Sequence, residues 1–415
     1  MITSSDTNIS SYKLVSCTIV SDVNGNAQDL RGLFTSFEIY EDMFSPYITA
    51  KISINDTFNI PETLPISGQE SVFIEFETEK NNITKVAFRV NCLKSHKISN
   101  SVGLQTYDLH LISECGYINF SQRCGYSLSG STKKMVDAII DKHFPQIKDN
   151  KKIEIEETKD KYKFVFPATY TPLKAISWLA SVATNSDDYS PFFFYETLSG
   201  YFFRSLKSIY ASGSANVQKY FYGYQTSVNR DSVLILDELT RFNTMQNIMN
   251  GCISSKLITH DLYNKQKSET ILTESQIFES KPKLGITPLW KSQDRMSVQM
   301  GINKGCSFYY RPSTSYTIWT KNNNITQNDK SEIIFLKRKH HITALLTQKI
   351  SIVVSGNAKR HVGEIIELVV PSSQNKEKKT DKNISGRYVI TALSHCFDLQ
   401  KYTCNIELSR DSMGV

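Results

Sequence analysis

The chain has 415 residues, of which 40% are hydrophobic and 11% aromatic. A chain of this length exceeds one ordinary hydrophobic core, and its apolar content excludes a disordered protein, so we expect about two to four folded domains. The net charge of +7 is spread along the sequence instead of forming a basic stripe, which argues against a protein that recognises a nucleic-acid sequence.

Neither the first residues nor the longest apolar run indicates a membrane or secreted protein. The stretch Met1–Ser11 is polar, and the longest apolar run, Pro191–Tyr195, is far below the ~20 residues of a membrane span. We therefore expect no signal peptide, no membrane anchor and synthesis in a cytoplasm. The eight cysteines form no C-x-x-C pair, so buried free thiols are favoured over disulfides or zinc ligands, and the sequons at Asn55, Asn82 and Asn324 carry no functional meaning.

The first part of the chain predicts a β-unit. The clearest alternation places Ile48, Ala50, Ile52 and Ile54 on one face of a strand with a single buried side. Five similar patterns accompany it before residue 114. The predicted strands are Tyr12–Val20, Leu33–Tyr40, Tyr47–Ile54, Ser71–Thr78, Val86–Leu93 and Gln105–Ser113. Short strands joined by polar turns indicate a small barrel or sandwich spanning residues 1–114.

Residues 115–210 have a different character and predict an α+β insertion. Ser131 or Thr132 is a suitable N-cap for a helix that ends at Phe144-Pro145, and Thr171-Pro172 is a strong start for a second helix. Two heavily aromatic segments, Pro191–Glu196 and Tyr201–Ile209, predict a hairpin. Its phenylalanines suit a close-packed core better than an exposed sugar-binding platform.

A second β-unit is predicted in the remainder. After a polar linker at residues 211–216, the spacing of apolar residues from Leu236 to Met249 predicts a helix ended by Gly251, and Cys252–Asp261 predicts a strand, so residues 211–264 begin this unit. Residues 265–330 form an irregular insertion, and residues 331–415 complete the unit. The predicted elements there are a strand at Ile333–Lys337, a short helix at Ile342–Leu346 and strands at Lys349–Val354, Glu364–Val370, Arg387–Phe397 and Lys401–Ser409.

One local feature links the two β-units. Gly68 and Gly363 each stand just before an apolar strand in the later part of their unit. This placement is compatible with two related barrels in one chain. The predicted class is thus α+β and β-rich, with two antiparallel barrels and an α+β insertion between them.

The sequence offers no catalytic, cofactor-binding or metal-binding residue. No GxSxG, HExxH or phosphate-cradling glycine pattern occurs, so no enzyme activity and no cofactor are predicted. The neighbours His340 and His341 diverge on either a strand or a helix and suit surface or packing roles, and His395 suits a hydrogen-bonded structural role. Carboxylates cluster at 154–160 and at positions 38, 41 and 42, where a glycosidase-like pair is the minor interpretation and charged connectors the major one.

The densest run of basic residues is Asn375–Asn383. It contains Lys376, Lys378, Lys379 and Lys382 interspersed with acidic residues. This mixture favours a solvated loop, with a phosphate or membrane contact as the alternative.

Several stretches together resemble the central baseplate hub proteins of contractile-tailed bacteriophages. FEIYEDMFSPYITAKISINDT followed by LPISGQESVFIEFET resembles their front, and FPATYTPLKAISWLASVA followed by SPFFFYETLSGYFFRSLKSI resembles their middle. RFNTMQNIMNGCISSKLITHD and SGRYVITALSHCFDLQKYTCNIELSRDSMG resemble their later part. These stretches cover a little under a third of the chain, in the expected order, and residues 265–330 depart most from the pattern.

The resemblance implies a structural role in a virion. It implies a homotrimer in which each chain supplies two related tube-type β-barrels, adapting a six-fold tail tube to a three-fold cell-puncturing spike. The implied partners are a separate spike protein on one face and the tail tube or a tube-initiator protein on the other, with the tape-measure protein and baseplate wedges nearby. The implied location is the tail baseplate, assembled in the host cytoplasm around a genome-ejection channel. DNA contact is then transient, and lysine and arginine are under-represented on the channel wall.

Two alternatives accompany this interpretation. The first is the equivalent hub of a phage-derived contractile injection system, which shares the same architecture. The second, of a different class, is a tail protein that binds or cleaves host glycans, with Glu154 or Glu156 as the acid residues to test and the aromatic hairpin as a sugar-binding surface.

Overall fold

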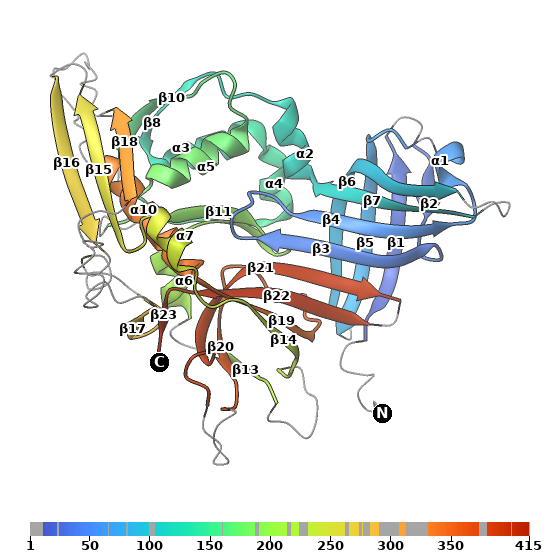
Figure 1. Ribbon diagram of the computed structural model, residues 1–415. Coiled ribbons are helices and arrows are strands. Elements are labelled where there is room, and N and C mark those ends of the chain that lie inside the picture. The colour runs from blue at the N-terminus through green and yellow to red at the C-terminus, as the bar shows by residue number, and fades with distance from the viewer. Residues whose placement is uncertain are drawn as a thin grey trace.

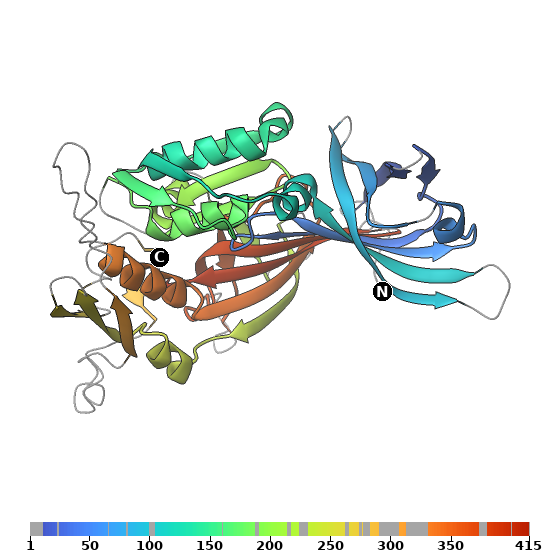
Figure 2. The ribbon, with the colours of Figure 1, turned by 90° about the horizontal axis from the view of Figure 1, so that it is seen from above.

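The computed structural model is an elongated, β-rich molecule in which a long sheet carries a mixed α/β domain on one side (Figures 1 and 2). The described residues are 11–22, 25–64, 66–79, 82–98, 104–159, 161–186, 191–213, 217–223, 231–261, 265–273, 276, 283–289, 307–312, 331–372, 380–399 and 401–414. The expected α+β, β-rich class is confirmed: thirteen strands form one sheet, with smaller sheets beside it.

The first half of this sheet comes from the start of the chain. Its strands are β1 (Lys13–Ser21), β2 (Ala27–Asp29), β3 (Phe34–Asp42), β4 (Thr49–Asp56), β5 (Glu70–Glu79), β6 (Asn82–Ile98) and β7 (Gln105–Ser113), with the short helix α1 (Ile60–Thr63) before β5. The spatial order is β3-β4-β7-β6-β5-β1-β2, and all these pairings are antiparallel. The predicted alternation is confirmed, because Ala50, Ile52 and Ile54 are fully buried along β4.

The inserted domain packs around its own hydrophobic core. Its helices are α2 (Glu114–Ser121), α3 (Thr132–His143), α4 (Pro145–Asn150), α5 (Pro172–Val182) and α6 (Leu206–Ser212), and its strands are β8 (Ser127–Ser131), β9 (Lys152–Ile155), β10 (Lys161–Val165), β11 (Phe192–Glu196) and β12 (Gly200–Ser205). Ser131 caps α3 by accepting a hydrogen bond from the N–H of Lys134, as predicted. The aromatic hairpin β11–β12 is core, with Phe192 and Phe203 fully buried.

The later part of the chain supplies the second half of the sheet and a separate small sheet. The large sheet receives β13 (Gln218–Phe221), β14 (Val233–Thr240), β19 (Gln348–Ser355), β20 (Ile365–Val369), β21 (Gly386–Asp398) and β22 (Tyr402–Arg410). Outside it lie α7 (Thr244–Met249), β15 (Ser254–Asp261), β16 (Gln266–Thr273), β17 (Thr287–Pro288), β18 (Ser307–Pro312), α10 (Ser331–Leu345) and β23 (Ser412–Met413). Strands β16, β15 and β18 form the small sheet, and β17 pairs with β23.

The two halves of the large sheet repeat one pattern of strands. The order β3-β4-β7-β6-β5 in the first half matches β14-β19-β22-β21-β20 in the second. Two of the irregularities coincide, whereas the shifts after Lys94 in β6 and after Glu238 in β14 have no counterpart. The register shifts after Phe34 in β3 and after Val233 in β14. It shifts again after Val90 in β6 and after Ile390 in β21. Bulges at equivalent positions indicate that the two halves are related units, as the placement of Gly68 and Gly363 suggested.

The two halves are joined edge to edge within the chain. Strand β21 pairs with β20 through its first residues and with β3 through Ala392–Asp398, so that Phe397 lies opposite Phe37. Figure 1 shows β21 and β22 lying beside β3 and β4. One core of apolar side chains runs beneath both halves, and a second core belongs to the inserted domain. The long-range β21–β3 ladder therefore makes the two β-units one continuous layer.

Three of the predicted elements are wrong, and each error has a reason in the local sequence. The strand predicted at Ile333–Lys337 is part of helix α10, because a short run of apolar residues fits a buried helix as well as a strand. The predicted helix at 236–249 is strand β14 followed by the short α7, and the helical spacing there belongs to exposed residues such as Leu239 and Met245. Strand β12 ends at Ser205, whose side chain caps α6.

Several predictions fall on residues outside the described ranges. They are the arm at residues 1–10, the end of the linker at 214–216, much of the irregular insertion at 265–330, Asn324, Cys306 and three lysines of the basic run. The seven described cysteines are free thiols, as predicted.

Candidate functional site

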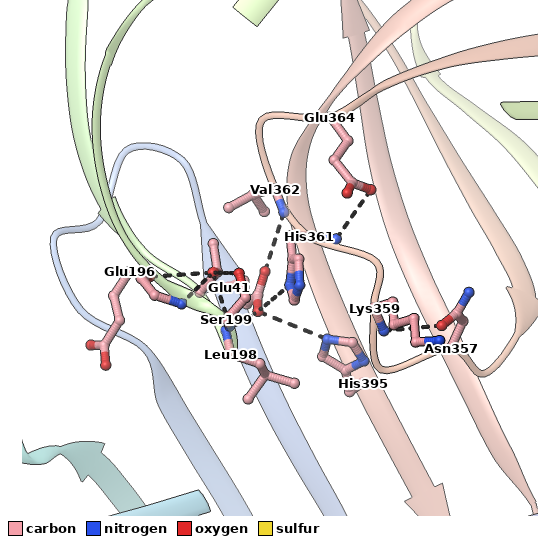
Figure 3. A network of polar contacts seen from close by, with 12 residues as sticks. Glu41, Glu196, Leu198, Ser199, Asn357, Lys359, His361, Val362, Glu364 and His395 are labelled. Carbon is pink, nitrogen blue, oxygen red and sulfur yellow. Dashed lines mark hydrogen bonds and ion pairs between the residues drawn. The ribbon is translucent and has the colours of Figure 1, made fainter. Parts of the chain in front are cut away.

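A buried carboxylate, Glu41, joins three parts of the chain at one point (Figure 3). It stands near the end of β3 and is 1% exposed. Its oxygens accept hydrogen bonds from the N–H of Leu198 in the β11–β12 turn at 2.7 Å and from the N–H of Val362 in the β19–β20 loop at 3.2 Å. Glu41 therefore fastens the inserted domain and the second β-half to the first.

Two histidines surround the same carboxylate. His361 Nδ1 lies 3.4 Å from Glu41 Oε1, and His395 Nε2, from β21, lies 4.0 Å from the same oxygen. Burial alone raises the pKa of Glu41, but the hydrogen bond from His361, the charges of both imidazoles and the N–H of Leu198 outweigh it and lower the net pKa. Burial lowers the pKa of His395, yet the sulfur of Cys404 and the carboxylate of Glu41 raise it overall. Both pKa shifts favour the ionised forms, a carboxylate at Glu41 and an imidazolium at His395, whose facing atoms lie 4.0 Å apart.

Glu41, His395 and Cys404 stand in the order of a catalytic triad. His395 Nδ1 lies 3.6 Å from Cys404 Sγ and 2.8 Å from the hydroxyl of Tyr402. Burial raises the pKa of the Cys404 thiol, but the charges of His395 and Arg360 outweigh burial. The net effect lowers this pKa to about 7. However, His395 and Cys404 are completely buried between packed strands. A nucleophile needs access to its substrate, so this arrangement joins the strands instead of catalysing a reaction.

A second buried carboxylate, Glu196, anchors the same end of the hairpin, because it is the last residue of β11 before the turn. One of its oxygens accepts from the N–H of Ile48 at 3.1 Å and the hydroxyl of Ser113 at 2.6 Å. The other accepts from Lys151 Nζ at 2.8 Å and the Tyr201 hydroxyl at 2.7 Å. Glu196 accepts from all four donors together. These hydrogen bonds fix the inserted domain to the start of β4 and the end of β7.

A tight backbone approach accompanies the Glu41 junction. Gly363, next to Val362, has φ +80°, and a Cβ atom there would lie 2.4 Å from the hydroxyl oxygen of Tyr195 on β11. Only glycine fits this left-handed conformation and this spacing. The loop that presents Val362 to Glu41 is therefore fixed by its own backbone.

The remaining candidates from the sequence have structural positions. His340 and His341 are both buried on α10, in agreement with the predicted packing role. Glu156 accepts hydrogen bonds from the N–H and hydroxyl of Ser205, and Glu154 pairs with Arg204 on β12 as well as with Lys152 on its own strand, so these carboxylates connect β9 and the residue after it to β12. None of these four residues contacts the Glu41 site.

Sequence reasoning missed the importance of Glu41 and Glu196. It placed Glu41 in the carboxylate cluster at positions 38, 41 and 42 and interpreted that cluster as a charged connector, because nothing in the local pattern indicates burial. The predicted hydrogen-bonded role of His395 is confirmed by its contact with Tyr402. Its link to Glu41 depends on the β21–β3 pairing, which joins residues more than 350 positions apart.

A cavity of about 900 Å³ lies where the inserted domain meets the second β-half. Its walls come from α5, α7 and α10, with aromatic side chains on one side and amides of α7 on the other. The lining includes Phe164, Trp178, Phe335, Asn243, Gln246 and Arg338. Such a combination of aromatic rings and amides can contact a polar ligand or a peptide.

Two further features of the described residues bear on the type of site. Among the residues that the structure describes, no three His, Cys, Asp or Glu side chains are grouped so that they could hold a metal ion. Within the same ranges, no helix combines the length and apolar character required to cross a membrane.

The comparisons with known proteins show a common fold. No protein-family model and no curated protein sequence matches the chain. A tail protein from Neisseria meningitidis MC58 matches with 11% identity and a TM-score of 0.58, over 97% of each chain. The 43 kDa tail protein of prophage MuSo2 from Shewanella oneidensis matches with 9% identity and a TM-score of 0.55, over 95% of this chain and 98% of that one.

These matches define the class of fold. The chain has the β-rich α+β fold of phage tail proteins, shared from one end to the other. The resemblance to baseplate hub proteins, noted from sequence segments covering a little under a third of the chain, is thereby confirmed for the fold as a whole.

Proposed function

We propose that this chain is a structural protein of a phage tail, the central hub of the baseplate, and not an enzyme. The observation that carries this proposal is the match to two tail proteins over 97% and 95% of this chain. The Glu41–His395–Cys404 arrangement is buried in the sheet, which supports a structural role for it.

The proposed hub is a homotrimer. Three chains, each with two related β-units, give six similar units around an axis, which suits an adaptor between a six-fold tube and a three-fold spike. The repeated strand order β3-β4-β7-β6-β5 and β14-β19-β22-β21-β20 supports this proposal. The proposed partners are the spike protein on one face and a tube or tube-initiator protein on the other, in a virion tail assembled in the host cytoplasm around the ejection channel.

The domain limits of the hub are part of the proposal. Residues 1–114 and the two segments 211–264 and 331–415 form the two tube-type units, with insertions at 115–210 and 265–330. Lysine and arginine are expected to be sparse on the channel wall, since a wall that gripped phosphates would retard the genome.

Native mass measurement tests the proposal. The purified chain is expected at three times its 47.3 kDa mass, alone or after addition of its spike partner. A strict monomer in both states would contradict the hub. Recovery of the chain from a contractile injection particle without a genome would favour the phage-derived machine, which shares this architecture.

A glycan-binding tail protein is the second candidate, and the cavity beside Trp178 is the observation that favours it. Aromatic rings next to amide side chains are typical of sugar-binding surfaces. Retention on immobilised host polysaccharide that is lost in Trp178→Ala would support this function. Loss of polysaccharide hydrolysis in Glu154→Gln or Glu156→Gln would revive the enzymatic form of it.

A further inference from the structure

Two long strand edges of the large sheet, on β6 and β14, have no ladder partner among the described residues. Strand β6 pairs with β7 along its second part, but β5 covers its other edge only as far as Arg89, so the edge from Asn91 to Ile98 is unpaired. Strand β14 pairs with β19 on one side and is the last strand of the sheet on the other. Unpaired edges of this length are templates for a further strand.

The internal repeat identifies the partner of each edge. Strand β6 is the counterpart of β21, and β14 is the counterpart of β3. Within the chain, β21 pairs with β3 through the part of its edge that β20 leaves open. We infer that the same ladder forms between chains, with β6 of one copy pairing antiparallel to β14 of the next. This inference rests on the proposed trimeric hub and assigns its contact surface.

The repeat also fixes the register of the ladder. Lys97 pairs with Thr106 as Cys396 pairs with Thr403, so Lys97 is the counterpart of Cys396. Asp237 pairs with Ser351 as Glu38 pairs with Lys51, so Asp237 is the counterpart of Glu38. Since Cys396 lies opposite Glu38, Lys97 of one copy lies opposite Asp237 of the next. The adjacent pair is Ile98 and Leu236, the counterparts of Phe397 and Phe37.

The charges at this register are complementary. Lys97 and Asp237 are both exposed in the single chain and carry opposite charges. Directly opposed residues of an antiparallel pair project from the same face with Cβ atoms about 5 Å apart, within reach of an ion pair. The predicted ladder therefore brings a lysine and an aspartate together at a distance that favours association.

A comparison with the junction inside the chain accounts for an exposed apolar residue at the edge of β6. Phe397 is 1% exposed, and Phe37 stacks on it across the β21–β3 ladder with ring centres 5.5 Å apart, beside the rings of Tyr402, Phe76 and Tyr12. Its counterpart Ile98 is 70% exposed. Pairing with β14 would cover Ile98 with Leu236 of the next copy. Leu234, Ile235 and Leu239 on β14 are also exposed, at 44%, 52% and 54%.

The two edges are different surfaces on one chain, so the contact is head to tail. Figure 2 shows the β6–β7 hairpin projecting at the opposite end of the molecule from the β14–α7 segment. Head-to-tail contacts generate closed rings when the rotation closes and filaments when it does not. In this ring every β3-like edge meets a β21-like edge, either within a chain or between chains.

Cysteine cross-linking tests the register directly. The single variants Lys97→Cys and Asp237→Cys change exposed residues, and mixing them under mild oxidation is expected to give a covalent dimer that neither variant gives alone. The double variant Lys97→Cys/Asp237→Cys is expected to form a ladder that ends at three chains. The matched control pairs Asp237→Cys with Lys163→Cys, an exposed position on β10 of the inserted domain.

Charge exchange provides a second measurement that requires no cross-link. Lys97→Glu and Asp237→Lys are each expected to shift the trimer toward monomer by about tenfold in dissociation constant, and the double exchange to restore it. A native trimer that neither cross-links at these positions nor responds to these charges overturns the ladder and leaves the hub standing. A ladder that extends beyond three chains supports the strand pairing and contradicts the trimeric hub. A chain that is monomeric throughout and forms no cross-link overturns both.

Discussion

At the scale of single residues, Glu41 is where the three parts of the chain depend on one side chain. Its oxygens accept from the N–H groups of Leu198 and Val362, and its charge opposes that of His395. Removing one member of a buried ion pair leaves the other uncompensated, which costs about 3–5 kcal/mol. We therefore expect Glu41→Gln to lower the free energy of unfolding by about 3 kcal/mol, measured by urea denaturation.

The pH dependence of this stabilisation follows from the two pKa shifts. The pKa of Glu41 is lowered in the folded protein, so its contribution is present above the ordinary value of 4.5 and is lost as the pH falls through the folded pKa. The pKa of His395 is raised, so its contribution is present below 6.5 and is lost as the pH rises through the folded pKa. The difference between wild type and Glu41→Gln should be greatest between these two values.

Glu38→Gln is the matched control, since Glu38 is half-buried on the same strand. It should change stability little and without this pH profile. An equal loss in both variants, or a Glu41→Gln effect that is constant from pH 4 to pH 8, would show that the carboxylate does not act through the ion pair.

At the scale of elements, what the sequence predicted depended on how regular the local pattern was. The strands β3, β4 and β7 and the helices α3 and α5 were predictable because alternation, an N-cap serine or a Thr-Pro start marked them. Of helix α10 only the end was predicted, at Ile342–Leu346, because the apolar residues of this helix extend around it, between the inserted domain and the second β-half. Such a helix has no single apolar stripe to detect.

Arg338 holds α10 in that position. Its Nη1 donates to the carbonyl oxygens of Ala180 at 3.2 Å and Phe192 at 2.6 Å, and its guanidinium carbon lies 5.3 Å from the ring centre of Phe193. Burial lowers the pKa of Arg338 to about 10. Hydrogen bonds from a charged donor contribute about 1.5–3 kcal/mol each.

We expect Arg338→Met to loosen α10 while leaving the large sheet intact. Amide hydrogen exchange in α10 should become faster by about tenfold or more, and exchange in β3 and β21 should not change. Lys337→Met, a change of the adjacent half-buried residue, serves as the control. Equal acceleration in both variants, or acceleration spread over the sheet, would contradict the anchoring role of Arg338.

At the scale of the whole molecule, the fold depends on pairings that local patterns cannot specify. Alternation predicts that β21 and β3 are strands with one buried face, but not that they pair, because many strands share the same pattern. The Glu41 site shares this limit, since its histidines come from the far end of the chain. The placement of Gly68 and Gly363 indicated two related units from the sequence alone. The matching bulges could be recognised only from the strand pairings in the structure.

The shared core predicts that the two halves of the sheet unfold together. Phe397, near the end of the chain, contacts rings from both halves: its ring centre lies 4.2 Å from Tyr402, 4.7 Å from Phe76, 5.1 Å from Tyr12 and 5.5 Å from Phe37. Truncating a buried phenylalanine costs about 3–5 kcal/mol, because the cavity cannot fully collapse. We expect Phe397→Ala to lower the stability of the first half as much as that of the second.

Hydrogen exchange measured strand by strand tests this coupling. In Phe397→Ala, amides of β1, β3 and β5 should lose protection together with those of β21 and β22, whereas the inserted domain, with its own core, should change less. Phe120→Ala, at a 57% exposed phenylalanine of α2, should leave all of these strands unchanged. Loss of protection confined to β21 and β22 would mean that the halves are separate domains that merely touch. Coupled loss would mean that the first and last strands of the chain hold one layer, as the proposed ring would require.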